Sequence, residues 1–246
     1  MTIGEHLEEL RSRLVRCLLA VAAGFALAFF RIEDVMAFVR RPLDQVLSKY
    51  GDAAVEAMQS KAYGAFMASM MVAFCAGCVL AAPVILHQLW AFVGAGLYAR
   101  ERRAVKYYAL PGFVLFLAGA ALSYFLVMPW ALDFLVGWAW EKMGTRSLLE
   151  IGDYVSLIAF SMFVFGLIFQ VPVVMVFLMR QGVVEAAFFR KYRRHAIVFV
   201  LAMAAVLTPP DVLSQLILGG AILFLYEGAI FVGARVSRPR DRGGKP

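Results

Sequence analysis

Charged residues and cysteines are both scarce in this sequence. Only 17% of the 246 residues are charged, against about a quarter in a typical soluble domain. The three cysteines, Cys17, Cys75 and Cys78, all fall in apolar segments, which argues against a framework of extracytoplasmic disulfides. Cys75 and Cys78 have CxxC spacing, but no second ligand pair accompanies them. We therefore interpret them as small packing residues rather than as a metal or redox site.

Recognisable catalytic motifs are also missing. The sequence contains neither a GxSxG nucleophile elbow nor an HExxH zinc motif. Residues 8–13 match the EExxxR pattern of intramembrane prenyl-peptide proteases, which need further histidine ligands at defined spacing in membrane helices. Here His6, His87 and His195 are scattered near the ends of apolar segments, and the pattern precedes the first of them. We predict that the chain is not an enzyme and holds no cofactor or metal.

Hydrophobic residues, in contrast, make up 63% of the chain, and the mean hydropathy is +0.78. Apolar stretches recur along its whole length, and most are long enough to cross about 30 Å of hydrocarbon. We predict an all-α membrane protein with six transmembrane helices in a single domain over residues 1–235. The expected spans cover residues 14–30, 63–98, 107–129, 154–179, 196–207 and 212–234.

Prolines are expected to shape several of these segments. Pro83 and Pro172 lie inside the second and fourth spans and predict bends there. Pro209 and Pro210 end the fifth span after only about 12 residues, which is short for a crossing. Between the first two spans, the polar stretch 31–61 contains an apolar pattern that predicts a short amphipathic helix. That pattern consists of Val35, Phe38, Val39, Pro42 and Val46.

The distribution of Lys and Arg predicts the orientation. Seventeen of these residues fall on the side that holds the N-terminus and only seven on the other. Because cytoplasmic loops carry the excess of basic residues, both termini are expected in the cytoplasm. Residues 236–246 are expected to form a basic, disordered cytoplasmic tail. The net charge of +7 is explained by this topology, so it gives no support to nucleic-acid binding.

Two acidic positions stand out on the predicted cytoplasmic side. Residues 2–13 form an amphipathic segment, within which Glu9 and Arg13 have the spacing of a helical ion pair. This segment is either an interfacial anchor or a docking surface for a basic ligand. Glu101 stands among Arg100, Arg102 and Arg103. Such a cluster suits lipid phosphates, yet the carboxylate is unnecessary for that task and suits an arginine supplied by a partner.

Gln170 and Glu227 are the polar residues placed deepest in the predicted spans. A polar group in hydrocarbon is unfavourable by a few kcal/mol unless it is paired. Each is a functional candidate, although hydrogen bonding between helices is an equally good interpretation of Gln170. A small-solute transporter or channel is the alternative function, but it would concentrate polar groups at the midplane rather than at the cytoplasmic ends. A structural membrane scaffold is the third possibility.

Five segments resemble one known family over about residues 5–235. They read HLEELRSRL at 6–14, APVILHQLWAF at 82–92, LYARERR at 97–103, FGLIFQVP at 165–172 and LTPPDVLSQ at 207–215. In order and spacing they are similar to the TatC component of the twin-arginine protein translocase. The resemblance implies a glove-shaped, six-helix receptor in the bacterial cytoplasmic membrane. It would bind signal peptides with two consecutive arginines and nucleate the assembly that transports folded proteins.

The resemblance also assigns residues and partners. Glu9 and Glu101 match the acidic positions that recognise the arginines, and four further residues lie beside them: Leu10, Arg11, Phe92 and Arg102. Single-span TatB-like and TatA-like proteins are expected to dock around the fifth and sixth helices. The candidates for intramembrane polar and partner contacts are Gln170, Glu227, Asp211 and Gln215. Energy would come from the proton-motive force, and several copies would associate in the receptor complex.

Two further expectations concern function. Many relatives have glutamate where Gln170 stands, and an amide keeps the hydrogen bonding but cannot titrate. The fifth and sixth helices are both expected to be short, so that hydrophobic mismatch would thin the bilayer locally and ease the passage of folded cargo.

Overall fold

The computed structural model describes residues 3–50, 55–58, 63–95, 99–143, 147–207 and 212–236. The side chains of 94–107 and of a few other positions lie outside this description. The elements in chain order are α1 (Ile3–Phe30), α2 (Ile32–Tyr50), β1 (Val55–Met58), α3 (Gly64–Ala95), α4 (Ala99–Leu122), the π-helix η1 (Ser123–Val127), α5 (Met128–Met143), β2 (Ser147–Glu150), α6 (Ile151–Ile168), α7 (Val171–Arg180), α8 (Ala186–Lys191), α9 (Arg193–Leu207) and α10 (Val212–Val236).

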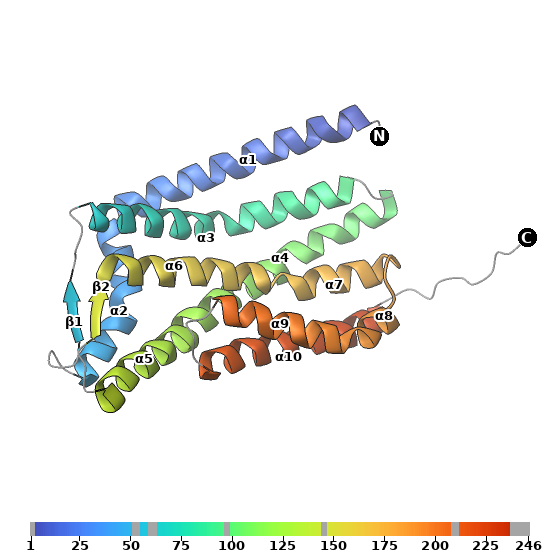
Figure 1. Ribbon diagram of the computed structural model, residues 1–246. Helices are drawn as coiled ribbons and strands as arrows, with labels where there is room; N and C mark the ends of the chain where they lie inside the picture. Colours follow the sequence, from blue (N-terminus) through green and yellow to red (C-terminus); the bar gives the residue numbers. More distant parts are fainter. Residues whose placement is uncertain are drawn as a thin grey trace, which may run out of the picture.

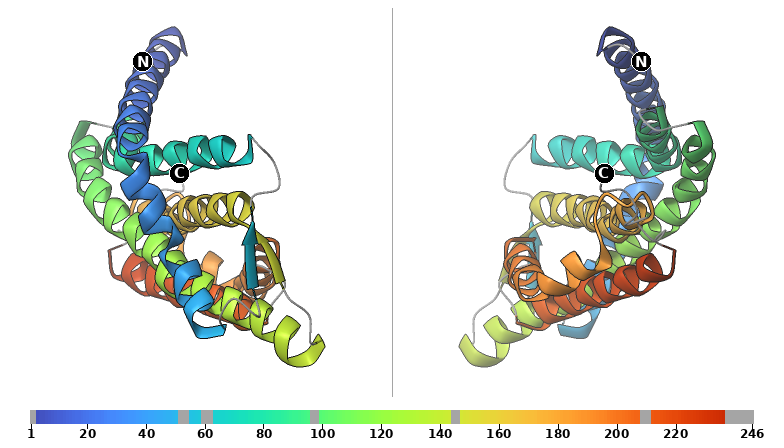
Figure 2. Two further views of the ribbon diagram at one scale, coloured as in Figure 1. Left: turned by 90° about the vertical axis from the view of Figure 1, so that its left-hand side faces the viewer. Right: turned by 90° about the vertical axis from the view of Figure 1, so that its right-hand side faces the viewer.

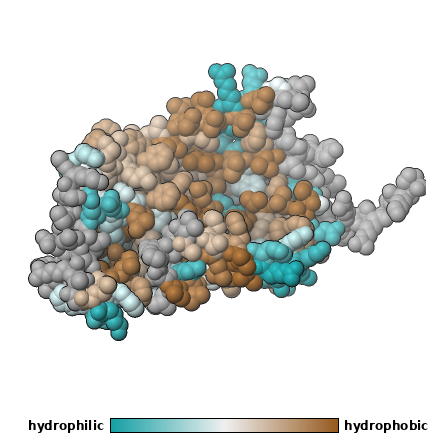
Figure 3. Space-filling view, viewed as in Figure 1, coloured by the Kyte–Doolittle hydropathy of each residue, from teal (hydrophilic) through white to brown (hydrophobic). Residues whose placement is uncertain are grey.

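The long helices lie roughly side by side and give the molecule two ends (Figure 1). Five helical segments in the described chain are long and apolar enough to cross a membrane: Leu7–Phe30, Gly64–Val93, Tyr108–Met143, Ile151–Arg180 and Ser214–Val236. Large apolar side chains are exposed along them, Phe30 to 85% and Phe224 to 79%, and much of the surface is hydrophobic (Figure 3). Such a surface suits lipid rather than water, so the prediction of a multi-span helical membrane protein is confirmed.

The first helix differs from its prediction. The N-terminal amphipathic segment is no separate surface helix, because α1 runs without a break from Ile3 through the first span. At one edge of the bundle, α1 packs mainly on α3 (Figure 2). The two backbones approach closely at Gly24 and Gly77, where a Cβ on Gly24 would lie 2.5 Å from the Gly77 carbonyl oxygen. Only glycine permits this approach, which is typical of membrane helix pairs.

Pro83 and Pro172 have different consequences. Helix α3 continues through Pro83 as one element. At Pro172, however, the fourth span is divided into α6 and α7, so the predicted interruption is confirmed there. The Gln170 N–H donates to the Leu167 carbonyl at 2.9 Å. This bond joins residues three positions apart, as in a 3₁₀ turn, rather than four apart as in an α-helix. This turn ends α6, and α7 begins at Val171. Pro172 therefore lies in the first turn of α7, where its missing N–H costs little.

The third span is longer than predicted. Helices α4 and α5 are joined through η1 into one rod, and its apolar part covers 36 residues from Tyr108 to Met143. The expected end at Pro129 was wrong because this proline lies in the first turn of α5, where proline is tolerated. The rod crosses the bundle diagonally (Figure 1), and such a tilt accommodates an over-long apolar segment.

The last two helices are unequal. Helix α9 has 15 residues, or about 22 Å at 1.5 Å per residue, so the prediction of a short fifth segment is confirmed. Helix α10 has 25 residues, or about 37 Å. The expectation that the sixth helix is also short was wrong, because its apolar pattern continues to Val236.

A cap covers the end where α1 meets α2. The predicted amphipathic helix is α2, and it buries Val39, Leu43 and Val46 together with Pro42. Beside it, β1 and β2 form a parallel pair in which Val55 is opposite Ser147; these strands were not expected from the sequence. Lys49 on α2 contacts the Asp133 carboxylate on α5 at 2.6 Å. The cap therefore ties together segments far apart in the chain.

Candidate functional site

Glu9 lies at the end of the bundle where α1 begins, α3 ends and α4 begins (Figure 1). Its Oε1 atom accepts hydrogen bonds from Arg13 Nε at 3.1 Å and from Arg13 Nη2 at 2.5 Å. The predicted ion pair is confirmed. Arg13 also donates from Nη1 to Gln88 Oε1 on α3 at 3.2 Å. These bonds connect the start of α1 to α3, a link that sequence spacing alone did not reveal.

The other predicted recognition residues lie around this pair. Leu10 and Arg11 are exposed on α1. Phe92 is half-buried on α3, four residues beyond Gln88 and hence on the same helical face. Glu101 and Arg102 lie in the first turn of α4, but their side chains are outside the described residues. The structure thus brings Glu9, Phe92 and the start of α4 to one end of the molecule.

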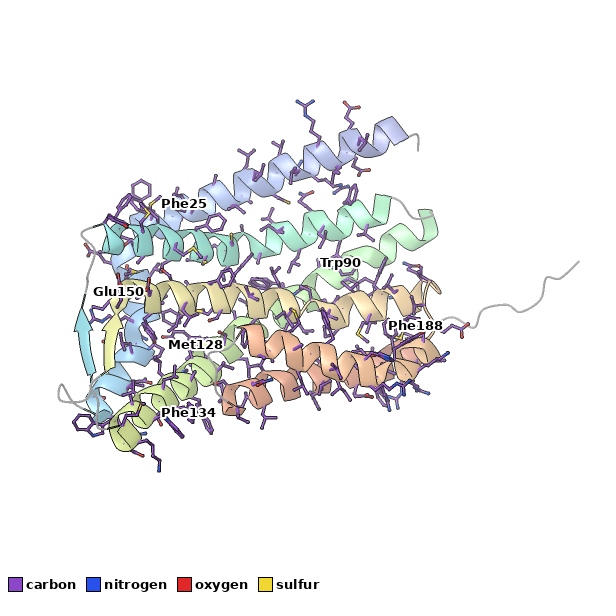
Figure 4. All side chains as sticks on the ribbon, in the orientation of Figure 1. Phe25, Trp90, Met128, Phe134, Glu150 and Phe188 are labelled. Carbon is purple, nitrogen blue, oxygen red and sulfur yellow. The ribbon has the colours of Figure 1, made fainter. Side chains whose placement is uncertain are left out.

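Aromatic packing supports this end from inside the bundle. The Trp90 ring on α3 stacks on Tyr108 of α4 with centroids 5.2 Å apart, and Phe177 of α7 packs edge-on at 5.1 Å. Figure 4 shows Trp90 between α3 and α7. Such aromatic pairs each add about 0.5–1.5 kcal/mol beyond the area they bury. Sequence reasoning missed this cluster, although Trp90 lies within the segment 82–92 that carries the family resemblance.

Gln170 fills the gap left where the fourth span breaks. Its Nε2 donates to the Gly112 carbonyl on α4 at 2.9 Å and more weakly to the Gly166 carbonyl at 3.4 Å. A Cβ on Gly112 would lie 3.0 Å from Gln170 Oε1, so the side chain requires a glycine opposite. Oε1 itself is buried and has no hydrogen-bond partner, and neither has the nearby Trp90 Nε1. The interpretation of Gln170 as a hydrogen-bonded link between helices is confirmed.

Glu227 lies within the apolar span Ser214–Val236, as predicted, but on the surface of the bundle rather than inside it. It pairs with Arg193, the first residue of α9, and about half of each side chain is exposed. A carboxylate can persist in an apolar helix here because its partner lies at a helix end beside it. Gln215 donates from Nε2 to the Leu201 carbonyl at 3.1 Å, which joins α10 to α9. Asp211, Pro209 and Pro210 lie outside the described residues.

An apolar groove of about 520 Å³ opens near the other end of the bundle. Helices α1, α2, α3 and α6 form its walls. The lining includes Leu27, Phe38, Val72 and Met162, with Arg31 as its charged residue. A groove with such an apolar lining suits an apolar chain segment.

These features define the class: a multi-span helical membrane protein with a partly buried ion pair at one end and an apolar groove near the other. The family model for the Sec-independent protein translocase protein (TatC) matches residues 5–220, and the chain belongs to this family. The TatC protein of Azotobacter chroococcum is 36% identical over 236 residues, covering 96% of this chain and 90% of the relative. TatCy of Bacillus subtilis is 32% identical over 248 residues, covering 98% and 92% respectively.

Solved structures agree with the sequence comparison. A crystal structure of the twin-arginine translocase receptor TatC in DDM superposes with a TM-score of 0.81 at 31% identity, covering 93% of this chain and 99% of the other. A second TatC crystal structure gives 0.80 over 95% and 100%. The chain is therefore a component of the Sec-independent, twin-arginine protein translocase. The family is one of translocase components and not of enzymes.

Proposed function

We propose that this chain is the receptor and core subunit of the twin-arginine translocase. It binds signal peptides that carry two consecutive arginines, and it nucleates the assembly that moves folded proteins across the bacterial cytoplasmic membrane. The observation that carries the proposal is the Glu9 carboxylate, which is paired with Arg13 at the end of the bundle where α4 begins, while Gln88 of α3 accepts a further hydrogen bond from Arg13. The receptor named among the similar solved structures supports the same assignment.

Two adjacent guanidinium groups need two separated carboxylates, because each group can form a bidentate pair of hydrogen bonds. Glu9 supplies one of these carboxylates. Glu101, in the first turn of α4, supplies the second, with Arg102 beside it. Leu10, Arg11 and Phe92 form the surrounding surface that the peptide contacts. Lysine fits less well, because its ammonium is a point charge without the planar fork.

The apolar groove suits the hydrophobic part of the same peptide. Glu9 and Leu27 are 18 positions apart on α1, which corresponds to about 27 Å along the helix. An extended chain covers that distance in about eight residues. A signal peptide whose arginines lie at Glu9 therefore reaches the groove with its apolar segment.

The positions of the first and last helices support the membrane orientation that the distribution of Lys and Arg predicts. Helix α1 begins and α10 ends at the same end of the bundle (Figure 1). We assign this end, which holds Glu9, to the cytoplasm. We assign residues 1–235 to one membrane domain of six crossings, with α9 as the short fifth crossing. Residues 237–246 lie outside the described chain, so the tail over 236–246 stays a prediction. TatB-like and TatA-like proteins dock at α9 and α10, near Gln215 and Asp211.

The test is site-specific crosslinking of a twin-arginine signal peptide to the full-length protein in membranes. Glu101→Lys is expected to abolish crosslinking while the protein still inserts, because a like charge repels the arginines. A peptide with two lysines is the ligand control. Undiminished crosslinking by Glu101→Lys would remove the role assigned to this carboxylate. Solute flux through liposomes that contain only this chain would favour a transporter instead.

A further inference from the structure

The Glu9 carboxylate already binds a guanidinium, and that guanidinium belongs to the chain itself. Arg13 donates two hydrogen bonds to Glu9 Oε1. The two side chains are withdrawn from solvent, with only 18% of Glu9 and 14% of Arg13 exposed. The second oxygen, Oε2, is enclosed and has no hydrogen-bond partner. In this state Glu9 offers no open pair of oxygens to an incoming arginine.

We propose that Arg13 is a tethered competitor for the site at Glu9, and that a signal-peptide arginine binds there by displacing it. This inference rests on the proposed function, since it presupposes that the peptide's guanidinium binds Glu9. One guanidinium replaces another on Glu9, so the carboxylate keeps a positively charged partner throughout the exchange. The carboxylate thereby avoids an unpaired, partly buried state, which is strongly unfavourable.

Gln88 gives the displaced side chain a place to go. Its Oε1 already accepts a hydrogen bond from Arg13 Nη1, so Arg13 can leave Glu9 and keep this contact. The amide oxygen is neutral, however, and holds a guanidinium less strongly than a carboxylate does. The exchange therefore weakens peptide binding by the difference between the two contacts. Weaker binding suits a receptor that must release each signal peptide after transport.

The alternative is that Arg13 merely positions Glu9. The two roles predict opposite results when Arg13 is removed. A positioning residue improves both folding and binding, so its loss weakens both. A competitor stabilises the free receptor but opposes the ligand, so its loss lowers thermal stability and raises affinity. Measuring both quantities on the same variant separates the two roles.

The experiment uses the full-length protein in nanodiscs and a fluorescent twin-arginine signal peptide. Arg13→Gln is expected to bind the peptide about tenfold more tightly, a change of about 1.4 kcal/mol, while its thermal midpoint falls. Arg16→Gln is the matched control, because it removes the same charge from the same helix. Arg16 is exposed, and within the described chain it contacts neither Glu9 nor Gln88. Its affinity should stay within twofold of the wild type.

Further variants distinguish the possible failures. In a Glu9→Gln background, Arg13→Gln should no longer change the affinity. Arg13→Lys should give a smaller gain than Arg13→Gln, and it replaces that variant if the glutamine form does not fold. Unchanged or weaker binding by the Arg13 variants would overturn the competitor role, as would an equal gain in Arg16→Gln. If the wild type does not prefer two arginines over two lysines, the proposed function itself fails.

Discussion

Gln170 offers a direct test of how the broken fourth span is held. Gln170→Leu keeps the approximate size of the side chain and removes the bond from Nε2 to the Gly112 carbonyl, 2.9 Å long. Side-chain hydrogen bonds in membrane proteins contribute about 0.6 kcal/mol on average and up to about 1.7. Loss of the unpaired Oε1 offsets part of this. Because Nε2 donates to two carbonyls, we take the upper end of this range, and the offset leaves a net destabilisation of about 1 kcal/mol.

The expected loss is measurable by thermal unfolding of the purified protein in detergent. For a chain of this size, about 1 kcal/mol corresponds to a decrease of about 2–4 °C in the midpoint. Gly112→Ala is a companion variant, because its new Cβ would lie 3.0 Å from Gln170 Oε1 and displace the same side chain. If Gln170→Leu unfolds at the wild-type temperature, the hydrogen bond carries none of the stability assigned to it.

Gln170→Glu separates hydrogen bonding from charge at the same position. A carboxyl group keeps the bond to the Gly112 carbonyl only when it is protonated, because a carboxylate has no donor. Burial favours the neutral form, so stability and export near neutral pH should stay close to wild type. Raising the pH ionises the group, and stability should then fall relative to the wild type. Severe loss of export at neutral pH would contradict a role in hydrogen bonding alone.

Three other expectations follow from packing and charge. Gly24→Leu should prevent α1 from lying on α3, since even a Cβ would lie 2.5 Å from the Gly77 carbonyl oxygen. The separated α1 should become sensitive to protease in membranes, and protease resistance equal to that of the wild type would contradict this expectation. Glu227→Gln keeps a hydrogen-bonding group beside Arg193 and should therefore cost about 0.6–1.7 kcal/mol, the range for side-chain contacts between membrane helices. A midpoint shift larger than about 4 °C would show that the charge itself contributes more. Trp90→Ala should destabilise the protein by about 3–5 kcal/mol. Trp90→Phe keeps an aromatic ring against Tyr108 and Phe177 and should lose much less stability. Equal losses of stability in the two variants would show that ring packing contributes little.

The sequence predicts those parts of the fold that depend on local patterns. Pro172 predicts the division between α6 and α7, and the apolar period predicts the buried face of α2. Features that depend on tertiary contacts were not predicted from the sequence. Pro129 resembles a helix end but lies in the first turn of α5, and no local pattern predicts that Arg193 pairs with Glu227. The pairing of β1 with β2 joins residues about 90 positions apart, a contact that no local pattern encodes.

The candidate site also contains contacts that local sequence patterns predict and contacts that they do not. The spacing of Glu9 and Arg13 predicts their ion pair, because helical geometry fixes it. Gln88 was missed because its role arises only when α3 meets α1. Trp90 and Gly112 were missed because their roles arise only when α3, α4 and the fourth span meet. Glu101 was identified from its charge context and the family resemblance, and its side chain remains outside the described residues. Long-range packing therefore determines what a locally predictable carboxylate can bind.

The state of Glu9 follows from a general constraint on receptors for cations. A carboxylate that is withdrawn from water must have a partner, because an unpaired buried charge costs several kcal/mol. A receptor that is empty between ligands must therefore expose its acidic residue or pair it internally. Glu9 is mostly enclosed, so exposure does not satisfy it, and among the side chains that the structure describes Arg13 is the cation paired with it. The contact that stabilises the free receptor is thus the same contact that a positively charged ligand must replace.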